Sequence, residues 1–102
     1  MLHCNMTRLS HGLRLGLEDL LADLWHARRV GDLGRLASLS YSDGRRWAQL
    51  AGRRGLAERA SEVVTARPHE SRASFLAQVD TLIAELELAL SSDVAQRTEL
   101  HR

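Results

Sequence analysis

Residues 70–96 read ESRASFLAQVDTLIAELELALSSDVAQ, and this stretch decides the fold. Its large apolar residues recur every three or four positions, which places them along one side of an α-helix. They are Phe75, Leu76, Val79, Leu82, Ile83, Leu86 and Leu90. With a rise of 1.5 Å per residue, a helix over this stretch is about 40 Å long. The pattern therefore predicts an all-α protein built along one long helix.

The opposite side of the same helix carries a second, narrower row of mostly small residues. We call this row the small-residue seam, and it consists of Ala77, Thr81, Ala84, Leu88, Ser91 and Ala95. Small side chains allow two helix backbones to approach closely. Alanine is also an ordinary helix former on exposed surfaces. The seam is thus either a helix–helix contact or plain surface.

The N-terminal third predicts another amphipathic helix, over about residues 7–30. Its apolar stripe holds Met6, Leu9, Leu13, Leu17, Leu20, Leu21 and Leu24. Gly31 suits the position after a helix end, and Asp32 suits the N-cap of the next helix. Because so short a connection makes its two helices antiparallel neighbours, we expect a helical hairpin.

Residues 33–53 allow two interpretations: two short helices with a turn at Ser40–Asp43, or one continuous helix. On a single helix, apolar and polar residues separate onto opposite sides, which favours the continuous form. The apolar side holds Leu33, Leu36, Leu39, Trp47, Leu50 and Ala51. Ser40 and Gly44 fall there too, and their small size would permit a close helix crossing. Asp43 also falls among these residues, and a buried unpaired charge is costly. We expect Asp43 to pair with an arginine or to lie exposed at the edge of the bundle, and the alternative is a buried polar group.

A short helix is expected over about residues 56–66, ended by Pro68. This helix is too short to cover the long one, so part of the apolar surface should stay exposed, and such patches mark interfaces. We therefore expect a single α-helical domain over residues 1–102, a bundle of about four helices completed by dimerisation. A homodimer with C2 symmetry would have the long helix and its seam at the contact.

Composition agrees with a helical core, since 44% of residues are hydrophobic but only 4% are aromatic. All 14 basic residues are arginines, which is typical of a GC-rich bacterial genome. The single cysteine, Cys4, fits a reducing compartment. No run of about 18 apolar residues could span a membrane. The expected location is the cytoplasm.

No pattern in the chain points to catalysis, a cofactor or a metal. His3, Cys4 and His11 lie near one another in sequence, but a structural zinc site needs about four ligands. His69 and Glu70 begin a zincin-like motif whose second histidine is missing, because residue 73 is Ala. Without lysine, the usual phosphate-binding loop is excluded. We expect a protein that is not an enzyme.

The strongest functional lead is a basic face on the helix over residues 33–53. It is formed by Arg35, Arg45, Arg46, Gln49 and Arg53. Such a face could contact the phosphates of a nucleic acid, although a net charge of +1 is unusual for that class. The favoured prediction is a non-catalytic protein-interaction or regulatory module that acts as a homodimer. The alternative is a nucleic-acid-binding protein that uses this face.

Overall fold

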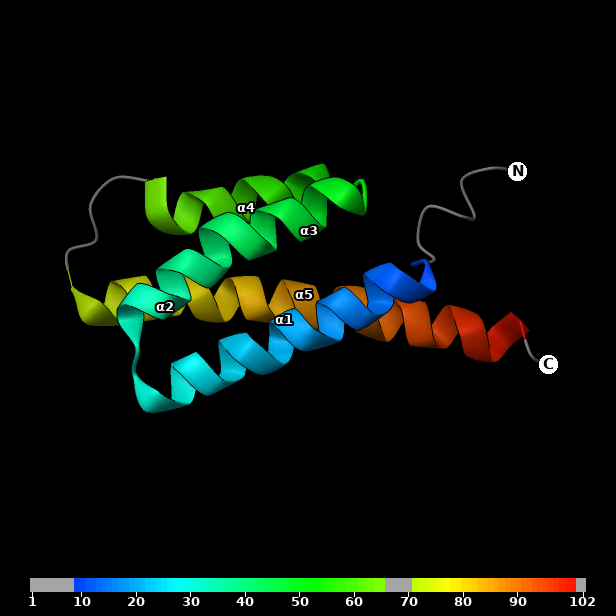
Figure 1. The fold of residues 1–102 in the computed structure, drawn as a ribbon, viewed down its shortest axis with the longest axis horizontal. Coiled ribbons are helices and arrows are strands. Elements are labelled where there is room, and N and C mark those ends of the chain that lie inside the picture. The colour runs from blue at the N-terminus through cyan, green and yellow to red at the C-terminus, as the bar shows by residue number, and fades with distance from the viewer. Residues whose placement is uncertain (1–8, 66–70, 101–102) are drawn as a thin grey trace.

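The structure, a computed structural model, describes residues 9–65 and 71–100, with side chains as far as residue 95. In this part of the chain every regular element is helical, and four rods pack together (Figure 1). The rods are α1 (His11–Val30); α2 (Leu33–Ser38) continued by the π-helical segment η2 (Leu39–Gly44) and α3 (Arg45–Leu50); α4 (Arg54–Thr65); and α5 (Arg72–Leu100). The predicted all-α bundle of four helices is confirmed.

The connection between the first two rods forms as the sequence indicates. Gly31 takes a left-handed conformation with φ 74°, and its N–H donates to the carbonyls of Ala27 and Arg28. The Asp32 carboxylate accepts the backbone N–H of Arg35 at 3.1 Å. Helix α1 begins at His11, where the Ser10 hydroxyl accepts the N–H of Leu13. The sequence placed that start at residue 7, and residues 1–8 lie outside the described part.

The second rod is continuous, as predicted, but it contains one π-helical turn. The residues that join its three parts all keep right-handed helical backbone angles. The N–H of Arg45 donates to the carbonyl of Ser40, five residues earlier in the chain. In an α-helix the acceptor is the carbonyl four residues earlier. This wider turn falls at residues 39–44, where the alternative interpretation placed a break.

The π turn changes which residues of the second rod face the core. It accommodates one extra residue, so the residues beyond it are rotated by about 100° relative to an uninterrupted α-helix. Leu50 is consequently 67% exposed, and Asp43 is exposed too. The expectation that Leu50 packs in the core is therefore wrong. Asp43 takes the exposed alternative and is not a buried polar group. Gly44 is buried, as predicted, and Ala48 is buried as well.

The buried small residues of η2 allow three rods to meet, as the sequence predicts. Ser40 and Gly44 are both buried. A Cβ atom added at Gly44 would lie 3.6 Å from the Ala60 Cβ of α4 and 3.9 Å from Leu82 Cδ2 of α5. These are van der Waals contact distances, so a side chain of one carbon atom would already touch both neighbouring helices. With glycine at this position, the backbone of η2 lies close to both of them.

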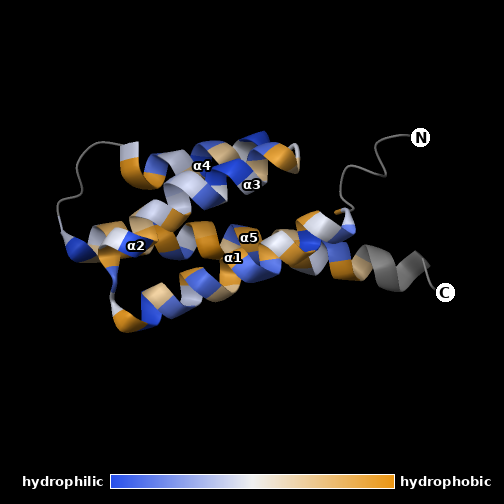
Figure 2. Cartoon of the chain, in the orientation of Figure 1, coloured by the Kyte–Doolittle hydropathy of each residue, from blue (hydrophilic) through white to orange (hydrophobic). Residues whose placement is uncertain are grey.

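The broad apolar stripe of α5 is covered within one chain. Val79, Leu82, Ile83 and Leu86 are at most 2% exposed, since α1 and α4 both pack against α5. Figure 2 shows hydrophobic segments turned towards the space between the rods. Because α1 lies beside α5, it adds to the cover that α4 provides. Phe75, Leu76 and Leu90 of the same stripe are only half-buried, so the incomplete cover expected from the short helix is limited to the two ends of the stripe.

None of the described helices combines the length and the apolar character that crossing a membrane requires.

Candidate interaction surfaces

The outer face of α5 is exposed along its described length. All six residues of the small-residue seam are exposed, and Leu88 is the most prominent at 67%. The Thr81 hydroxyl donates to the carbonyl of Ala77 at 3.0 Å, so its hydrogen-bonding need is met within the helix. Apolar residues lie on both sides of α5, since its core side is buried while Leu88 and Val94 are exposed. A helix face of this kind is more usual in contact with another protein surface than with water.

Two of the acidic residues that flank the seam are paired with arginines. On the α1 side, Arg28 pairs with Asp80 through two hydrogen bonds of 2.8 and 3.2 Å. The hydrogen bond to Asp80 raises the pKa of Arg28 above its ordinary value, so this arginine keeps its charge at any working pH. On the α4 side, Arg59 lies 3.0 Å from Glu85. Glu87, which also flanks the seam, has a tryptophan and no arginine as its partner among the described residues.

Three shallow hollows border the seam, and two of them lie on opposite sides of it. One, of about 450 Å³, lies between α1 and α5 and includes Ala84 in its lining. There the Trp25 indole, which is 43% exposed, donates to Glu87 Oε2 at 2.8 Å. The other hollow, of about 320 Å³, lies between α4 and α5 and includes Leu88. The seam is thus a ridge with a depression on each side, a shape into which side chains of an apposed helix can fit.

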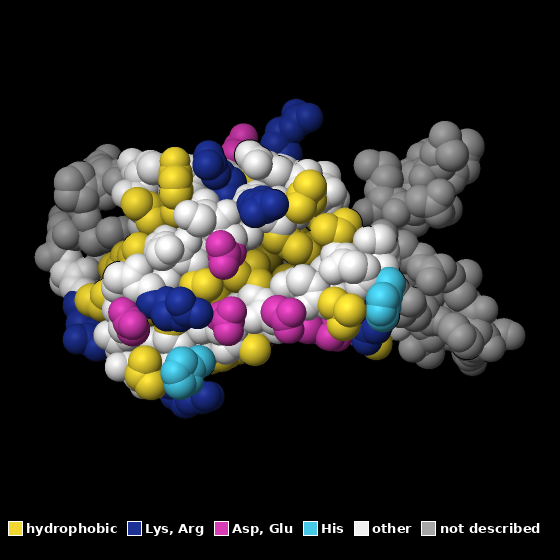
Figure 3. All heavy atoms as spheres, in the orientation of Figure 1, with side chains coloured by type: hydrophobic (Ala, Val, Ile, Leu, Met, Phe, Trp, Pro, Cys, Tyr) yellow, Lys and Arg dark blue, Asp and Glu magenta, His cyan; other side chains and the backbone are white. Residues whose placement is uncertain are grey.

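The largest hollow among the described residues, about 510 Å³, lies between α3 and α4. We call it the arginine groove. Its polar lining consists of Arg45, Gln49, Arg53, Arg54, Glu58 and Ser61. The guanidinium of Arg45 stacks 4.5 Å above the ring of Tyr41, which fixes its position. Figure 3 shows basic side chains over α3 and α4 and a row of acidic side chains along α1.

The structure divides the basic face indicated by the sequence. Arg45, Gln49 and Arg53 lie together in the arginine groove. Arg46 is exposed but is not part of its lining. Arg35 lies 4.0 Å from Asp23 of α1, away from the others. Sequence reasoning missed Arg54, because the turn at Gly52 and the start of α4 bring it beside α3 only in the folded chain.

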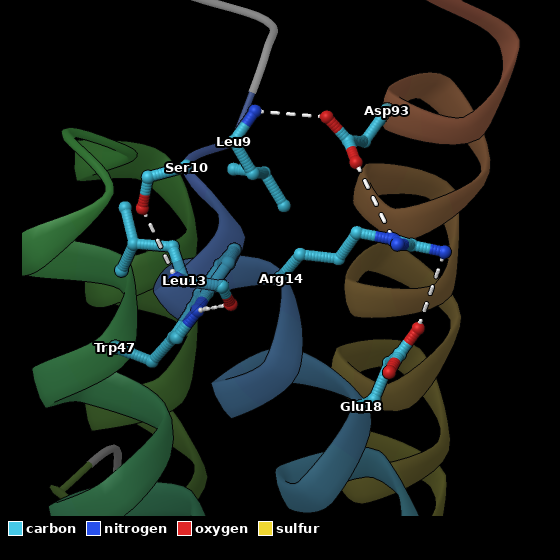
Figure 4. Close-up of polar contacts among 7 residues, drawn as sticks. All are labelled: Leu9, Ser10, Leu13, Arg14, Glu18, Trp47 and Asp93. Atoms are coloured by element: carbon cyan, nitrogen blue, oxygen red, sulfur yellow. Dashed lines mark hydrogen bonds and ion pairs between the residues drawn. The ribbon is translucent and has the colours of Figure 1, made fainter. Parts of the chain in front are cut away.

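A second feature that the sequence did not single out is the buried carboxylate of Asp93. It is fully buried on α5, where Oδ1 accepts the N–H of Leu9 at 2.8 Å and Oδ2 lies 3.7 Å from Arg14 Nε (Figure 4). Arg14 also reaches Glu18 at 3.5 Å. Nearby, the Trp47 indole donates to the Leu13 carbonyl at 2.8 Å. These contacts join the start of α1 to α5 and α3, which is a structural role.

No cluster of three or more metal-binding side chains occurs among the described residues. His3, Cys4, His69 and Glu70, weighed above as ligands, lie outside them. No protein-family model, no curated protein and no solved structure matches this chain.

Proposed function

We propose that this protein is a non-catalytic interaction module that pairs with a second copy of itself through the outer face of α5. The carrying observation is that α5 presents apolar residues to solvent on one side while its other side fills the core. In a C2 pair, each seam would lie against the seam of the other copy. Such a contact needs no other protein, because the same surface of each copy forms half of the interface.

Three features of the outer face support a second copy as the occupant. The seam spans residues 77–95, about 27 Å along the helix axis, which is long enough for two helices to pack side by side. Its side chains are mostly small, so the backbones can approach closely. The flanking carboxylates of Asp80 and Glu85 are already paired with arginines, so two copies can meet without strong repulsion between like charges.

The proposal is tested by replacing Leu88 with glutamate. Burying a leucine side chain contributes about 1.5–3 kcal/mol, and C2 symmetry places Leu88 at the contact in both copies. Leu88→Glu should therefore weaken dimerisation by at least about a hundredfold. Sedimentation equilibrium or light scattering across a dilution series measures this change.

Leu50→Glu is a matched control, because Leu50 is also 67% exposed but lies on α3. It should leave the dimerisation constant unchanged. A wild-type protein that stays monomeric at high micromolar concentration would overturn the proposal. So would a dimer that Leu50→Glu disrupts as strongly as Leu88→Glu does.

Nucleic-acid binding through the basic face is the second candidate. It is favoured by the arginine groove but weakened by the separate position of Arg35, which pairs with Asp23. A polyanion needs a continuous track of unpaired cations. Retention on a DNA column that falls steeply with salt, and that is lost in Arg45→Glu/Arg46→Glu, would support this candidate.

A further inference from the structure

The arginines of this protein fall into two groups by their partners. Among the described residues, Arg14, Arg28, Arg35 and Arg59 each lie within 4.0 Å of a carboxylate. The three arginines of the arginine groove make no ion pair with any described carboxylate. These are Arg45, Arg53 and Arg54. Arg29, Arg46 and Arg72 make no ion pair with a described carboxylate either, but none of them lines this groove. Three unpaired cations therefore share one hollow.

From this arrangement we propose that the arginine groove binds a compact phosphorylated ligand through Arg45, Arg53 and Arg54. Arginine guanidinium groups bind phosphate oxygens through paired, charge-assisted hydrogen bonds. Gln49 and Ser61, which also line the groove, supply a neutral amide and a hydroxyl beside these cations. The groove lies between α3 and α4 and adjoins the proposed dimer surface only at Arg53, which also lines the hollow that contains Leu88.

The position of Arg53 strengthens the attraction for an anion. Its side chain is half-buried, and its Nη2 atom is shielded from solvent and has no hydrogen-bond partner within the described structure. A guanidinium that has lost part of its hydration without gaining a carboxylate interacts more strongly with an approaching anion than a fully hydrated one does. Arg45, held against Tyr41, is likewise restrained before any ligand arrives.

The start of α4 adds a further positive element at the same place. Arg53 occupies the N-cap position, since its carbonyl accepts the first intrahelical bond, from the N–H of Ala57. The first turn of α4 contains no acidic residue. The N–H groups of this turn and the helix dipole therefore add to the charge of the arginines. Glu58, one turn further along α4, is the acidic residue in the lining of the groove.

The size and surroundings of the groove favour a compact ligand over a polymer. A volume of about 510 Å³ matches a small-molecule site. Glu58 lines the same groove and would repel a long polyanion laid across α4. A ligand with one or two phosphate groups meets three arginines and the single carboxylate of Glu58 in this groove.

Titration of the whole protein with pyrophosphate at constant ionic strength tests the proposal, followed by backbone amide NMR and by calorimetry. Pyrophosphate should shift the amides of Gly52, Arg54 and Gly55 selectively. The double variant Arg53→Gln/Arg54→Gln should weaken binding by at least about tenfold, because two charged donors are lost. Arg29→Gln/Arg46→Gln removes the same charge from exposed positions outside the groove and should change binding less than about twofold.

Titrations with adenosine diphosphate and with a single-stranded oligonucleotide distinguish which kind of phosphorylated ligand binds. Adenosine diphosphate that binds more tightly than pyrophosphate would support a nucleotide as the ligand, and equal affinities would support recognition of phosphate alone. Equal losses in the two double variants, or amide shifts spread over the whole surface, would overturn the proposal. A single-stranded oligonucleotide whose affinity exceeds both and grows with length would overturn it in favour of nucleic-acid binding. Ala84→Glu, on the side of the seam that faces α1, should leave pyrophosphate affinity unchanged, which separates this test from that of the dimer.

Discussion

Asp93 shows how one residue can fix the relative position of two helices. It lies near the C-terminal end of α5 with no exposed surface, and it accepts the N–H of Leu9 and faces Arg14. A buried carboxylate is costly unless it is paired and hydrogen-bonded. Here the cost is offset by partners from the segment that leads into α1, so Asp93 holds that segment against α5.

Asp93→Ala should destabilise the fold by about 3 kcal/mol or more, because it leaves the Leu9 N–H and part of the Arg14 guanidinium without their acceptor. Urea denaturation followed by circular dichroism measures the loss. Asp80→Ala is the matched control, since its ion pair with Arg28 is half-exposed and should be worth about 1 kcal/mol or less. Equal losses in the two variants would contradict the structural role assigned to Asp93.

At the scale of elements, the π turn of η2 changes which residues of the second rod reach the core. Before it, Leu36 and Leu39 face the core; after it, Trp47 and Ala48 do. On an uninterrupted α-helix these positions would spread over a wide arc. The extra residue in the π turn rotates the later half back towards the core.

Deleting Ser42, an exposed residue of the π turn, should convert η2 into ordinary α-helix and leave the core residues on either side in place. The free energy of unfolding should change by about 1 kcal/mol or less, as measured by urea denaturation. Deleting Asp19, an exposed residue within α1, is the control. It rotates Leu20, Leu21 and Leu24 away from the core and should cost more than about 3 kcal/mol. A strongly destabilised Ser42 deletion would show that the π turn is itself required.

At the scale of the whole molecule, α5 sets the shape and its outer face sets the expected assembly. The molecule measures 47 × 24 × 18 Å, and α5 runs along the longest direction (Figure 1). The seam runs along this axis and faces perpendicular to it. Two copies joined through the seam would therefore lie side by side. The dimer would be thicker than one copy but only slightly longer.

Small-angle X-ray scattering of the dimer should therefore give a maximum dimension well below twice the 47 Å of one copy. Leu88→Glu should restore the scattering profile of a single copy. An end-to-end assembly, with a maximum dimension near twice that length, would exclude the outer face of α5 as the contact.

The amino-acid sequence by itself determined the helical class, the number of rods and the first turn between them. Periodic leucines specify helix faces, and Gly31 and Asp32 specify local backbone geometry and hydrogen bonds. These signals act over three to five residues, so they can be recognised without knowledge of the fold. The apolar stripe of α5 and the small residues of η2 were identified in the same way.

The tertiary structure alone decided which surfaces are covered and which charges are paired. Three features depend on how separate rods are placed. Helix α1 packs over the apolar stripe of α5, Arg54 lies with Arg45 in one groove, and Asp93 accepts the N–H of Leu9. The exposed positions of Asp43 and Leu50 depend on the π turn. This turn rotates the second half of the rod so that Trp47 and Ala48 pack in the core. Contacts between residues far apart in the chain leave no periodic trace in the sequence, and for that reason only the folded chain reveals them.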